Sequence, residues 1–303
     1  MNILVAGGTG LIGSHVLREL LATRPSERLH VLTRDPGRPH PLSAHVRRVR
    51  GDVGDPASLA QAVRGMDVVI HAVQFPNHPV ENPRKGWTYL EVDGRGTVNM
   101  VAACRKVGVQ RFIYLSGAGV RPGRTEPWFQ AKAMAEEAIQ RSGLPYVIIR
   151  PSWVYGPGDR SVNKFVKMAR LLPFMPVIGD GEGKVQPVSV LDVARVVTLA
   201  VDLPEATNRI FEAGGPEALT MNQILQTVLR VLGKRRPLVH HPVGFMKAVA
   251  SILQYLPNPP LTPAAIDFIL MEERVDPTET ERVFGVKFER FQDGLRRYLG
   301  PRR

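Results

Sequence analysis

The amino-acid sequence predicts an α/β protein with a doubly wound parallel sheet and a smaller C-terminal lobe. Three observations lead to this prediction. Strand-like and helix-like segments alternate through the first half of the chain. A glycine-rich turn joins the first strand-like segment to the first helix-like one. Residues 67–72 are almost wholly apolar, as in a strand that is covered on both faces.

The individual elements follow from local patterns of apolar residues. Helical spacing covers residues 11–22, 56–63, 88–107 and 127–141, and strands are expected at 2–6, 30–33, 46–49, 67–72, 111–116 and 146–150. After Pro151 the alternation weakens, and proline and glycine interrupt the chain. We therefore expect one domain over residues 1–150. In the C-terminal part, residues 151–303, some segments should return to the sheet while the rest form a small substrate or partner lobe.

Length and composition narrow the possible functions. The 303 residues carry 44% hydrophobic and 22% charged residues, a balance typical of a globular protein, with no apolar run long enough to span a membrane. A secretory signal is not evident and the single cysteine, Cys104, cannot form an internal disulfide, so a cytoplasmic protein is expected. The net charge of +12 is spread along the chain without a nucleic-acid-binding module, which favours an anionic small molecule or membrane surface as partner. His240 and His241 lack spaced partners, so no metal site is expected.

The strongest motif is the turn GGTGLIG at residues 7–13. Glycines permit a tight turn and a close approach to a pyrophosphate, and the helix that follows directs its N–H groups and positive dipole end at the phosphates. This position between strand and helix predicts a Rossmann-type dinucleotide site; the alternative is a purely structural turn. The candidate cofactor-binding residues here are Gly7, Thr9, Gly10, Leu11, Ile12 and Gly13.

The end of the second strand selects between the two nicotinamide dinucleotides. An acidic residue there would bind the ribose hydroxyls of NAD, whereas an arginine accommodates the 2′-phosphate of NADP. Arg34 occupies this position and Thr33 is a hydrogen-bonding neighbour, although Asp35 follows directly. The sequence favours NADP and leaves NAD open.

Two further strand ends should line the cofactor. Asp52 could accept a hydrogen bond from the adenine amino group, with Val53 packed on the ring. His71, Ala72 and Val73 end the fourth strand, where the ribose should lie. For His71 the sequence favours an ordinary buried histidine of the strand over a catalytic residue.

Motifs along the chain resemble the extended and atypical short-chain dehydrogenase/reductases. They are GGTGLIG, GDVGD at 51–55, DVVIHA at 67–72, FIYLSG at 112–117, RPSWVYGPGD at 150–159 and QPVSVLDVA at 186–194. The C-terminal half, with NKFVKMARLLPFMPVIGDGEGKVQPVSVLDVA and LPNPPLTPAAIDFIL, is most similar to the NDUFA9-like group, named after an accessory subunit of respiratory complex I. The resemblance implies hydride transfer between a nicotinamide and a carbonyl or alcohol, with a tyrosine moving the proton and a lysine four residues later.

The chain departs from this pattern at the proton-transfer residues. Lys132 matches the lysine, but Trp128 stands at the tyrosine position, and an indole N–H cannot cycle a proton near neutral pH. Ser116 is the candidate for the family's serine, although Ala118 follows where a hydroxyl would be nearest the substrate. Asp93 stands where many relatives place asparagine.

The residues after the sixth strand should border the nicotinamide end of the site. Pro151, Ser152 and Trp153 are candidates for cofactor contacts there. Tyr155 is the nearest tyrosine that could substitute for the missing one, or it is a packing residue.

Residues 245–256 form a candidate amphipathic helix. Phe245, Ile252 and Leu256 share one helical face, and Lys234 to Arg236 precede it. Such a helix can lie peripherally on the inner face of a membrane with anionic lipids, or pack on its own domain.

Together these features predict an NADP(H)-binding, short-chain dehydrogenase/reductase-like protein with a degraded Tyr-Lys site. One hypothesis is a cofactor-stabilised structural or assembly protein, or a weakly active redox protein, with a respiratory-complex-like partner. The alternative is an active NAD(P)-dependent oxidoreductase, or a nucleotide-sugar epimerase or dehydratase, that uses an unusual proton donor.

Overall fold

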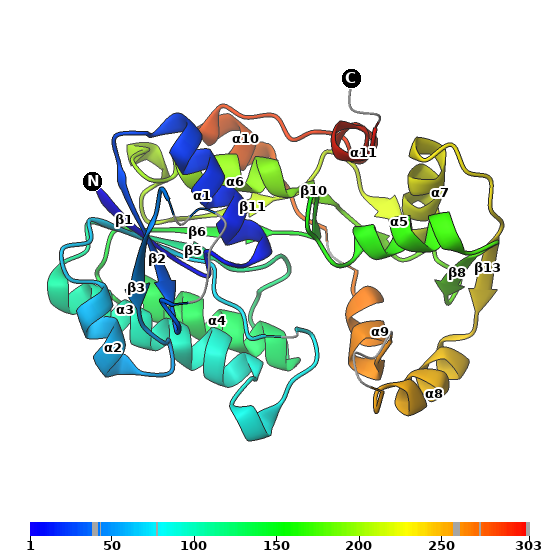
Figure 1. The fold of residues 1–303 in the computed structure, drawn as a ribbon, viewed down its shortest axis with the longest axis horizontal. Coiled ribbons are helices and arrows are strands. Elements are labelled where there is room, and N and C mark those ends of the chain that lie inside the picture. Colours follow the sequence, from blue (N-terminus) through cyan, green and yellow to red (C-terminus); the bar gives the residue numbers. More distant parts are fainter. Residues whose placement is uncertain (38–41, 43, 77, 257–260, 273, 301–303) are drawn as a thin grey trace.

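A sheet of seven parallel strands forms the centre of the molecule and carries helices on both faces (Figure 1). The computed structural model describes residues 1–37, 42, 44–76, 78–256, 261–272 and 274–300. In sheet order, the strands are β11 (Arg209–Ala213), β6 (Tyr146–Pro151), β5 (Arg111–Leu115), β4 (Val68–His71), β1 (Asn2–Ala6), β2 (Arg28–Thr33) and β3 (Arg47–Arg50). The strand order reverses between β1 and β4, where ligands bind in open sheets of this kind. The predicted Rossmann-type fold is confirmed.

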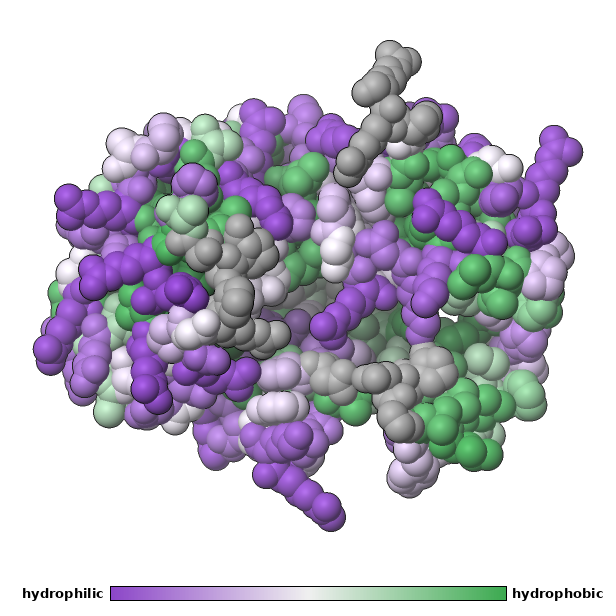
Figure 2. Space-filling view, viewed as in Figure 1, coloured by the Kyte–Doolittle hydropathy of each residue, from purple (hydrophilic) through white to green (hydrophobic). Residues whose placement is uncertain are grey.

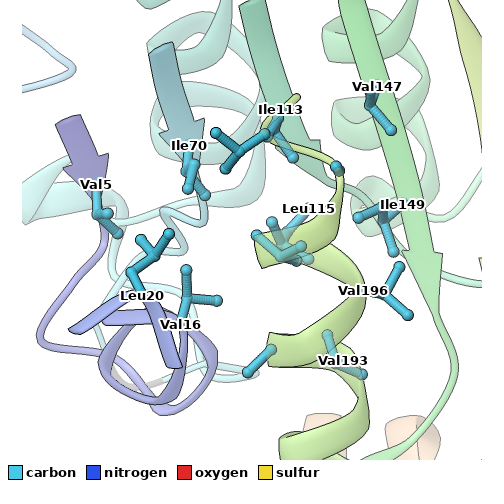
Figure 3. Close-up of a cluster of buried hydrophobic side chains, with 14 of the residues drawn as sticks. Val5, Val16, Leu20, Ile70, Ile113, Leu115, Val147, Ile149, Val193 and Val196 are labelled. Carbon is cyan, nitrogen blue, oxygen red and sulfur yellow. The ribbon is translucent and has the colours of Figure 1, made fainter. Parts of the chain in front are cut away.

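Apolar side chains hold the helices against the two faces of the sheet. The helices that pack on it are α1 (Leu11–Thr23), α2 (Pro56–Ala62), α3 (Gly96–Val107), α4 (Pro127–Gln140), α6 (Val190–Leu199) and α10 (Thr278–Phe284). On one face, valine and isoleucine side chains from four strands meet Val16 and Leu20 of α1 and Val193 and Val196 of α6 (Figure 3). The other face packs on α2, α3 and α4 and includes the buried thiol of Cys104. Because both faces are covered, the central strands are apolar on both sides.

The segment predicted as a single helix over residues 88–107 is two elements. A π-helical segment, η2 (Tyr89–Arg95), leads into α3. Thr88 caps η2, because its side chain accepts a hydrogen bond from the Glu91 amide at 3.1 Å. π-helical turns are rare, and those that occur are often found at functional sites. This one carries Asp93.

The C-terminal lobe consists of short strand pairs and helices around its own apolar core. Its strands are β7 (Val154–Tyr155), β8 (Met175–Ile178), β9 (Lys184–Val185), β10 (Val188–Ser189), β12 (Leu219–Thr220) and β13 (Leu238–His241), and its helices are α5 (Val162–Leu171), α7 (Met221–Val231), α8 (Val243–Leu253), α9 (Pro263–Ile269) and α11 (Phe291–Leu299). Short 3-10 turns, η1 (Pro83–Lys85) and η3 (Pro204–Ala206), complete the elements. β11 returns to the sheet beside β6. Residues 257–260, within the second C-terminal motif, lie outside the described residues.

Helix α8 stands at the outer edge of this lobe and buries little of itself. Ala250 is its one buried residue, while Phe245 is 58% and Ile252 76% exposed, and Tyr255 just beyond the helix is 85% exposed. Figure 2 shows an apolar surface at its lower right, where Figure 1 places α8. Across the described ranges, none of the helices is both long enough and apolar enough to cross a bilayer.

Candidate functional site

The glycine turn lies against the end of β4. Gly7 has a φ of +86°, and a Cβ on it would stand 2.3 Å from the carbonyl oxygen of Ala72. A Cβ on Gly13 would stand 2.3 Å from the Gly7 carbonyl oxygen. Both positions therefore require glycine, and the turn is drawn tightly over the strand ends.

The N-terminus of α1 faces outward from this turn without a side-chain cap. Gly10 is the N-cap residue, makes no side-chain bond, and is followed by a first turn without acidic residues. Thr9 and Gly10 are exposed, and Leu11 and Ile12 are half-buried. Exposed N–H groups at a helix start suit a phosphate, so this cradle fits the pyrophosphate of a dinucleotide.

The residues expected to distinguish NADP from NAD lie together at the end of β2. Arg34 is exposed. The Asp35 carboxylate instead turns back on its own loop, where Oδ1 accepts a hydrogen bond from the Gly37 amide at 2.9 Å. Thr33 Oγ1 lies 3.2 Å from both the amide and the carbonyl of Asp35, so this threonine stabilises the loop.

The neighbouring strand ends contribute mainly packing and backbone contacts. Asp52 Oδ1 accepts from the Gly54 amide at 2.9 Å, and Val53 is buried. His71 is fully buried, and Nε2 lies 3.0 Å from the Thr97 hydroxyl. Because that hydroxyl donates to the Asp93 carbonyl oxygen at 2.6 Å, His71 Nε2 carries the hydrogen. Burial lowers the pKa of His71 to about 3, so its ring is neutral. Val73 follows Ala72 beyond the strand and packs on the apolar core beneath α3.

Lys132 is buried and held by three groups of the interior. Its Nζ donates to the Leu115 carbonyl oxygen at 3.2 Å, lies 3.6 Å from Asp93 Oδ1, and stands 5.2 Å from the centre of the Tyr114 ring. Asp93 Oδ2 accepts from the Phe75 amide at 3.2 Å. Burial raises the pKa of the Asp93 carboxyl to about 6, although the Lys132 ammonium opposes this shift. The lysine therefore has a carboxyl partner that titrates near neutral pH.

Trp128 lies one helical turn before Lys132 on α4 and fills the space beside β5. A Cβ on Gly117 would stand 2.3 Å from Cη2 of the indole, so a side chain at position 117 and this indole exclude each other. The indole is 8% exposed, and its Nε1 is buried without a hydrogen-bond partner among the described residues. Trp128 and Gly117 therefore form a matched pair, and Ala118 beside them is fully buried.

The side chains of Ser116 and Tyr155 are engaged with groups other than Lys132 and Trp128. Ser116 Oγ donates to Glu136 Oε1 at 2.5 Å, and Glu136 forms a two-point ion pair with Arg150. Tyr155 packs in the core of the C-terminal lobe, with its ring centre 4.8 Å from that of Phe291. Its burial raises its pKa, which disfavours the phenolate.

Pro151, Ser152 and Trp153 link the sheet to the lobe. Pro151 pairs with Ala213 as the last residue of β6. The Ser152 hydroxyl donates to the Gln186 carbonyl oxygen, and Trp153 Nε1 donates to Ser161 Oγ at 3.0 Å. The polar groups of these two side chains are thus engaged within the protein.

The structure also contains an aromatic cluster beside Trp128 that the sequence did not predict. It contains Phe75, His78, Tyr89 and Phe268. Phe268 comes from α9 in the C-terminal lobe, so no local spacing connects it to Trp128. For Phe75, His78 and Tyr89, the sequence offered one signal, which is the concentration of aromatic residues between positions 75 and 89.

These features define a nicotinamide-dinucleotide-binding protein of the Rossmann type. Residues 7–204 match the model of the NAD(P)H-binding family, and the chain belongs to that family. Its relatives agree with the sequence motifs in placing it among the atypical short-chain dehydrogenase/reductases, in the NDUFA9-like group.

The relatives of this chain include a subunit of a respiratory enzyme and a reductase. The chain is 24% identical to the mitochondrial NADH dehydrogenase [ubiquinone] 1 alpha subcomplex subunit 9 of Arabidopsis thaliana, over 95% of this chain and 72% of that protein. It is 28% identical to the 2-alkyl-3-oxoalkanoate reductase of Stenotrophomonas maltophilia, over 98% of each. The solved UDP-glucose 4-epimerase of Thermus thermophilus, in complex with NAD, superimposes with a TM-score of 0.74 at 24% identity, over 98% of this chain and 97% of that one. At this identity, the last match shows the fold alone.

The contact between Gly117 and Trp128 can be tested by measuring the free energy of unfolding of variants. Gly117→Ala should destabilise the protein by about 1–3 kcal/mol, because the new methyl group overlaps the indole. Adding Trp128→Phe should recover part of this loss, a non-additive effect measurable by urea unfolding. Gly244→Ala in α8 is the control, since nothing lies within 4 Å of its Cβ. A Gly117→Ala variant as stable as the wild type would show that the pair is not matched.

Proposed function

We propose that the chain binds NADP(H) through residues 1–150 and does not use the tyrosine-dependent chemistry of its family. The observation that carries this proposal is Trp128, whose indole packs against Gly117 one helical turn before Lys132. The glycine cradle would hold the pyrophosphate, and the strand ends from β2 to β4 would border the adenosine half. When bound, the nicotinamide supplies or accepts a hydride.

The preference for NADP rests on the exposure of Arg34 and on the engagement of the neighbouring Asp35 carboxylate. Arg34 is exposed at the end of β2, free to approach a 2′-phosphate. Asp35 would favour NAD if its carboxylate reached the ribose, but that carboxylate accepts from Gly37. The arginine therefore supports the phosphorylated cofactor.

The altered proton-transfer site supports a cofactor-stabilised structural or assembly role, or weak redox activity. An indole N–H donates a hydrogen bond but is too weak an acid to give up its proton near pH 7. Ser116 is hydrogen-bonded to Glu136, and Tyr155 is buried in the lobe. The relative named as a subunit of NADH dehydrogenase fits a role in an assembly.

Asp93 keeps the alternative of an active oxidoreductase or epimerase open. Its carboxyl is next to Lys132, and burial raises its pKa to about 6. A protonated carboxyl can donate to an oxygen that gains charge during reduction, the task that the missing tyrosine performs in the family. The relative named as an oxoalkanoate reductase fits this second candidate.

Helix α8 supports a peripheral association with an anionic membrane. Phe245 and Ile252 of this helix expose most of their apolar surface. Lys234 and Arg235 are exposed on the segment before β13. In the sequence, β13 separates these cations from α8. Apolar insertion by α8 and attraction of these cations to lipid phosphates would act together.

The cofactor preference is tested by titrating both nucleotides. Wild-type protein should bind NADPH more tightly than NADH. Arg34→Ala should weaken NADPH binding by about 1.5–3 kcal/mol and leave NADH nearly unchanged, because only NADPH loses a charge-assisted contact. Arg28→Ala, at the other end of β2, is the control. Equal wild-type affinities would overturn the NADP assignment.

The chemistry is tested by following NADPH absorbance with ketones and sugar nucleotides. Turnover should be slow or absent, because the usual acid contributes about 10²–10⁴-fold. Any activity that depends on Asp93 should rise as the pH falls through about 6, since its carboxyl is protonated below that value. Asp93→Asn should remove this rise. Rapid turnover that survives Asp93→Asn and is lost in Tyr155→Phe would show that Tyr155 is the proton donor.

The membrane association is tested by co-sedimentation with vesicles. Binding to phosphatidylglycerol-containing vesicles should exceed binding to phosphatidylcholine alone and decrease at high salt. Ile252→Glu should reduce binding by at least about tenfold, because an apolar side chain of this size contributes roughly 1.5–3 kcal/mol on burial. Val107→Glu is the control, at the end of α3 in the other part of the molecule. Failure of the wild type to bind anionic vesicles at low salt would remove the proposal.

A further inference from the structure

One side chain of the C-terminal lobe reaches the candidate site. Phe268, on α9, has its ring centre 4.8 Å from that of His78 and 6.3 Å from that of Trp128, with interplanar angles of 87° and 86°. Behind it, Phe75 contacts Tyr89 and His78 at 4.7 and 5.8 Å. A benzene ring that comes from 140 positions further along the chain than Trp128 therefore covers two nitrogen-containing rings.

Those two rings hide polar atoms that Phe268 cannot satisfy. Trp128 Nε1 and His78 Nε2 are both buried, with no hydrogen-bond partner in the described parts of the chain. Burial also lowers the pKa of His78 to about 4, so its ring is neutral and presents one donor and one acceptor. Trp153 shows the usual arrangement, since its Nε1 donates to Ser161. Unsatisfied buried polar atoms are costly and rare, and here two of them belong to rings that pack on the same phenylalanine.

Phe268 lies on a short helix that a surface ion pair helps to hold in place. Phe268 lies in the seven-residue helix α9, which is joined to α8 by the ion pair of Asp267 with Lys247 at 2.5 Å. Both partners of this ion pair are substantially exposed, so it stabilises the closed position only weakly. A ligand of suitable shape could displace Phe268 without disturbing the sheet.

We infer that Phe268 occupies the place of a ligand ring, and that this ligand is a flat conjugated ketone whose oxygen accepts a hydrogen bond from Trp128 Nε1. The inference rests on the proposed function, because it deepens the description of the same site. A planar ring would replace the edge contacts of Phe268 with His78 and Trp128. The ketone oxygen would supply the acceptor that Phe268 lacks. A sugar would leave most of its hydroxyl groups without partners among these aromatic walls.

Equilibrium dialysis with two matched probes tests the inference. The probes are 2-acetonaphthone and 2-ethylnaphthalene, which share a shape but differ in the carbonyl oxygen, and saturating NADP⁺ prevents turnover. Trp128→Phe should weaken 2-acetonaphthone binding about tenfold and leave 2-ethylnaphthalene unchanged, because only the ketone loses a hydrogen bond. Trp153→Phe should change neither, since its indole already has a partner.

Removal of the covering ring gives an independent measurement. Phe268→Ala should strengthen binding of 2-acetonaphthone several-fold, because no side chain has to be displaced. Leu270→Ala is the matched control, an exposed residue at the end of the same helix. If Trp128→Phe fails to fold, as judged by thermal melting, the comparison of these two variants decides.

The outcomes separate the inference from the proposed function. A titration of NADP⁺ on the same samples shows whether the cofactor binds, and failure there contradicts the proposed function. If NADP⁺ binds but Trp128→Phe weakens the binding of both probes equally, the proposed hydrogen bond between Trp128 and the ketone does not form. If Phe268→Ala gains no more affinity than Leu270→Ala, Phe268 does not occupy a ligand position.

Discussion

Backbone contact between Gly7 and the end of β4 is the constraint on which the site depends. The turn passes so close to the Ala72 carbonyl oxygen that a single methyl group would not fit. This contact places the start of α1 directly over the point where the strand order reverses. The phosphate cradle is therefore a consequence of how two neighbouring parallel strands end, and the strand ends around it border the same crevice.

A second constraint is a buried polar network just beyond the end of β5, in which each polar side chain has a partner. Glu136 takes both a guanidinium and a hydroxyl, from Arg150 and Ser116. Truncating one partner would leave a buried charge in an apolar environment, which is more costly than losing the pair itself. This network commits the serine to structure. It leaves the Lys132–Asp93 pair as the titratable centre of the site.

The sequence was sufficient for features that depend on neighbouring residues. The strand positions and the glycine turn follow from local periodicity and from the conformational needs of Gly7 and Gly13. The break of the predicted helix at 88–107 into η2 and α3 was not predictable, because apolar spacing does not distinguish a π turn from an α turn. The contacts of Trp128 with Phe268 and of Ser116 with Glu136 depend on tertiary packing. The pattern of residues 245–256 predicts a helix but cannot say which face is covered, and in the structure Phe245 and Ile252 stay exposed while Ala250 is buried.

The return of β11 to the sheet affects how the chain can fold during synthesis. The chain leaves the sheet after β6, builds much of the lobe, and then supplies the outermost strand. Until residues 209–213 emerge from the ribosome, β6 presents an unpaired edge beside its apolar neighbours. Open edges of this kind are prone to pairing with other chains. A nascent chain that ends before β11 therefore presents an open sheet edge that the finished protein covers.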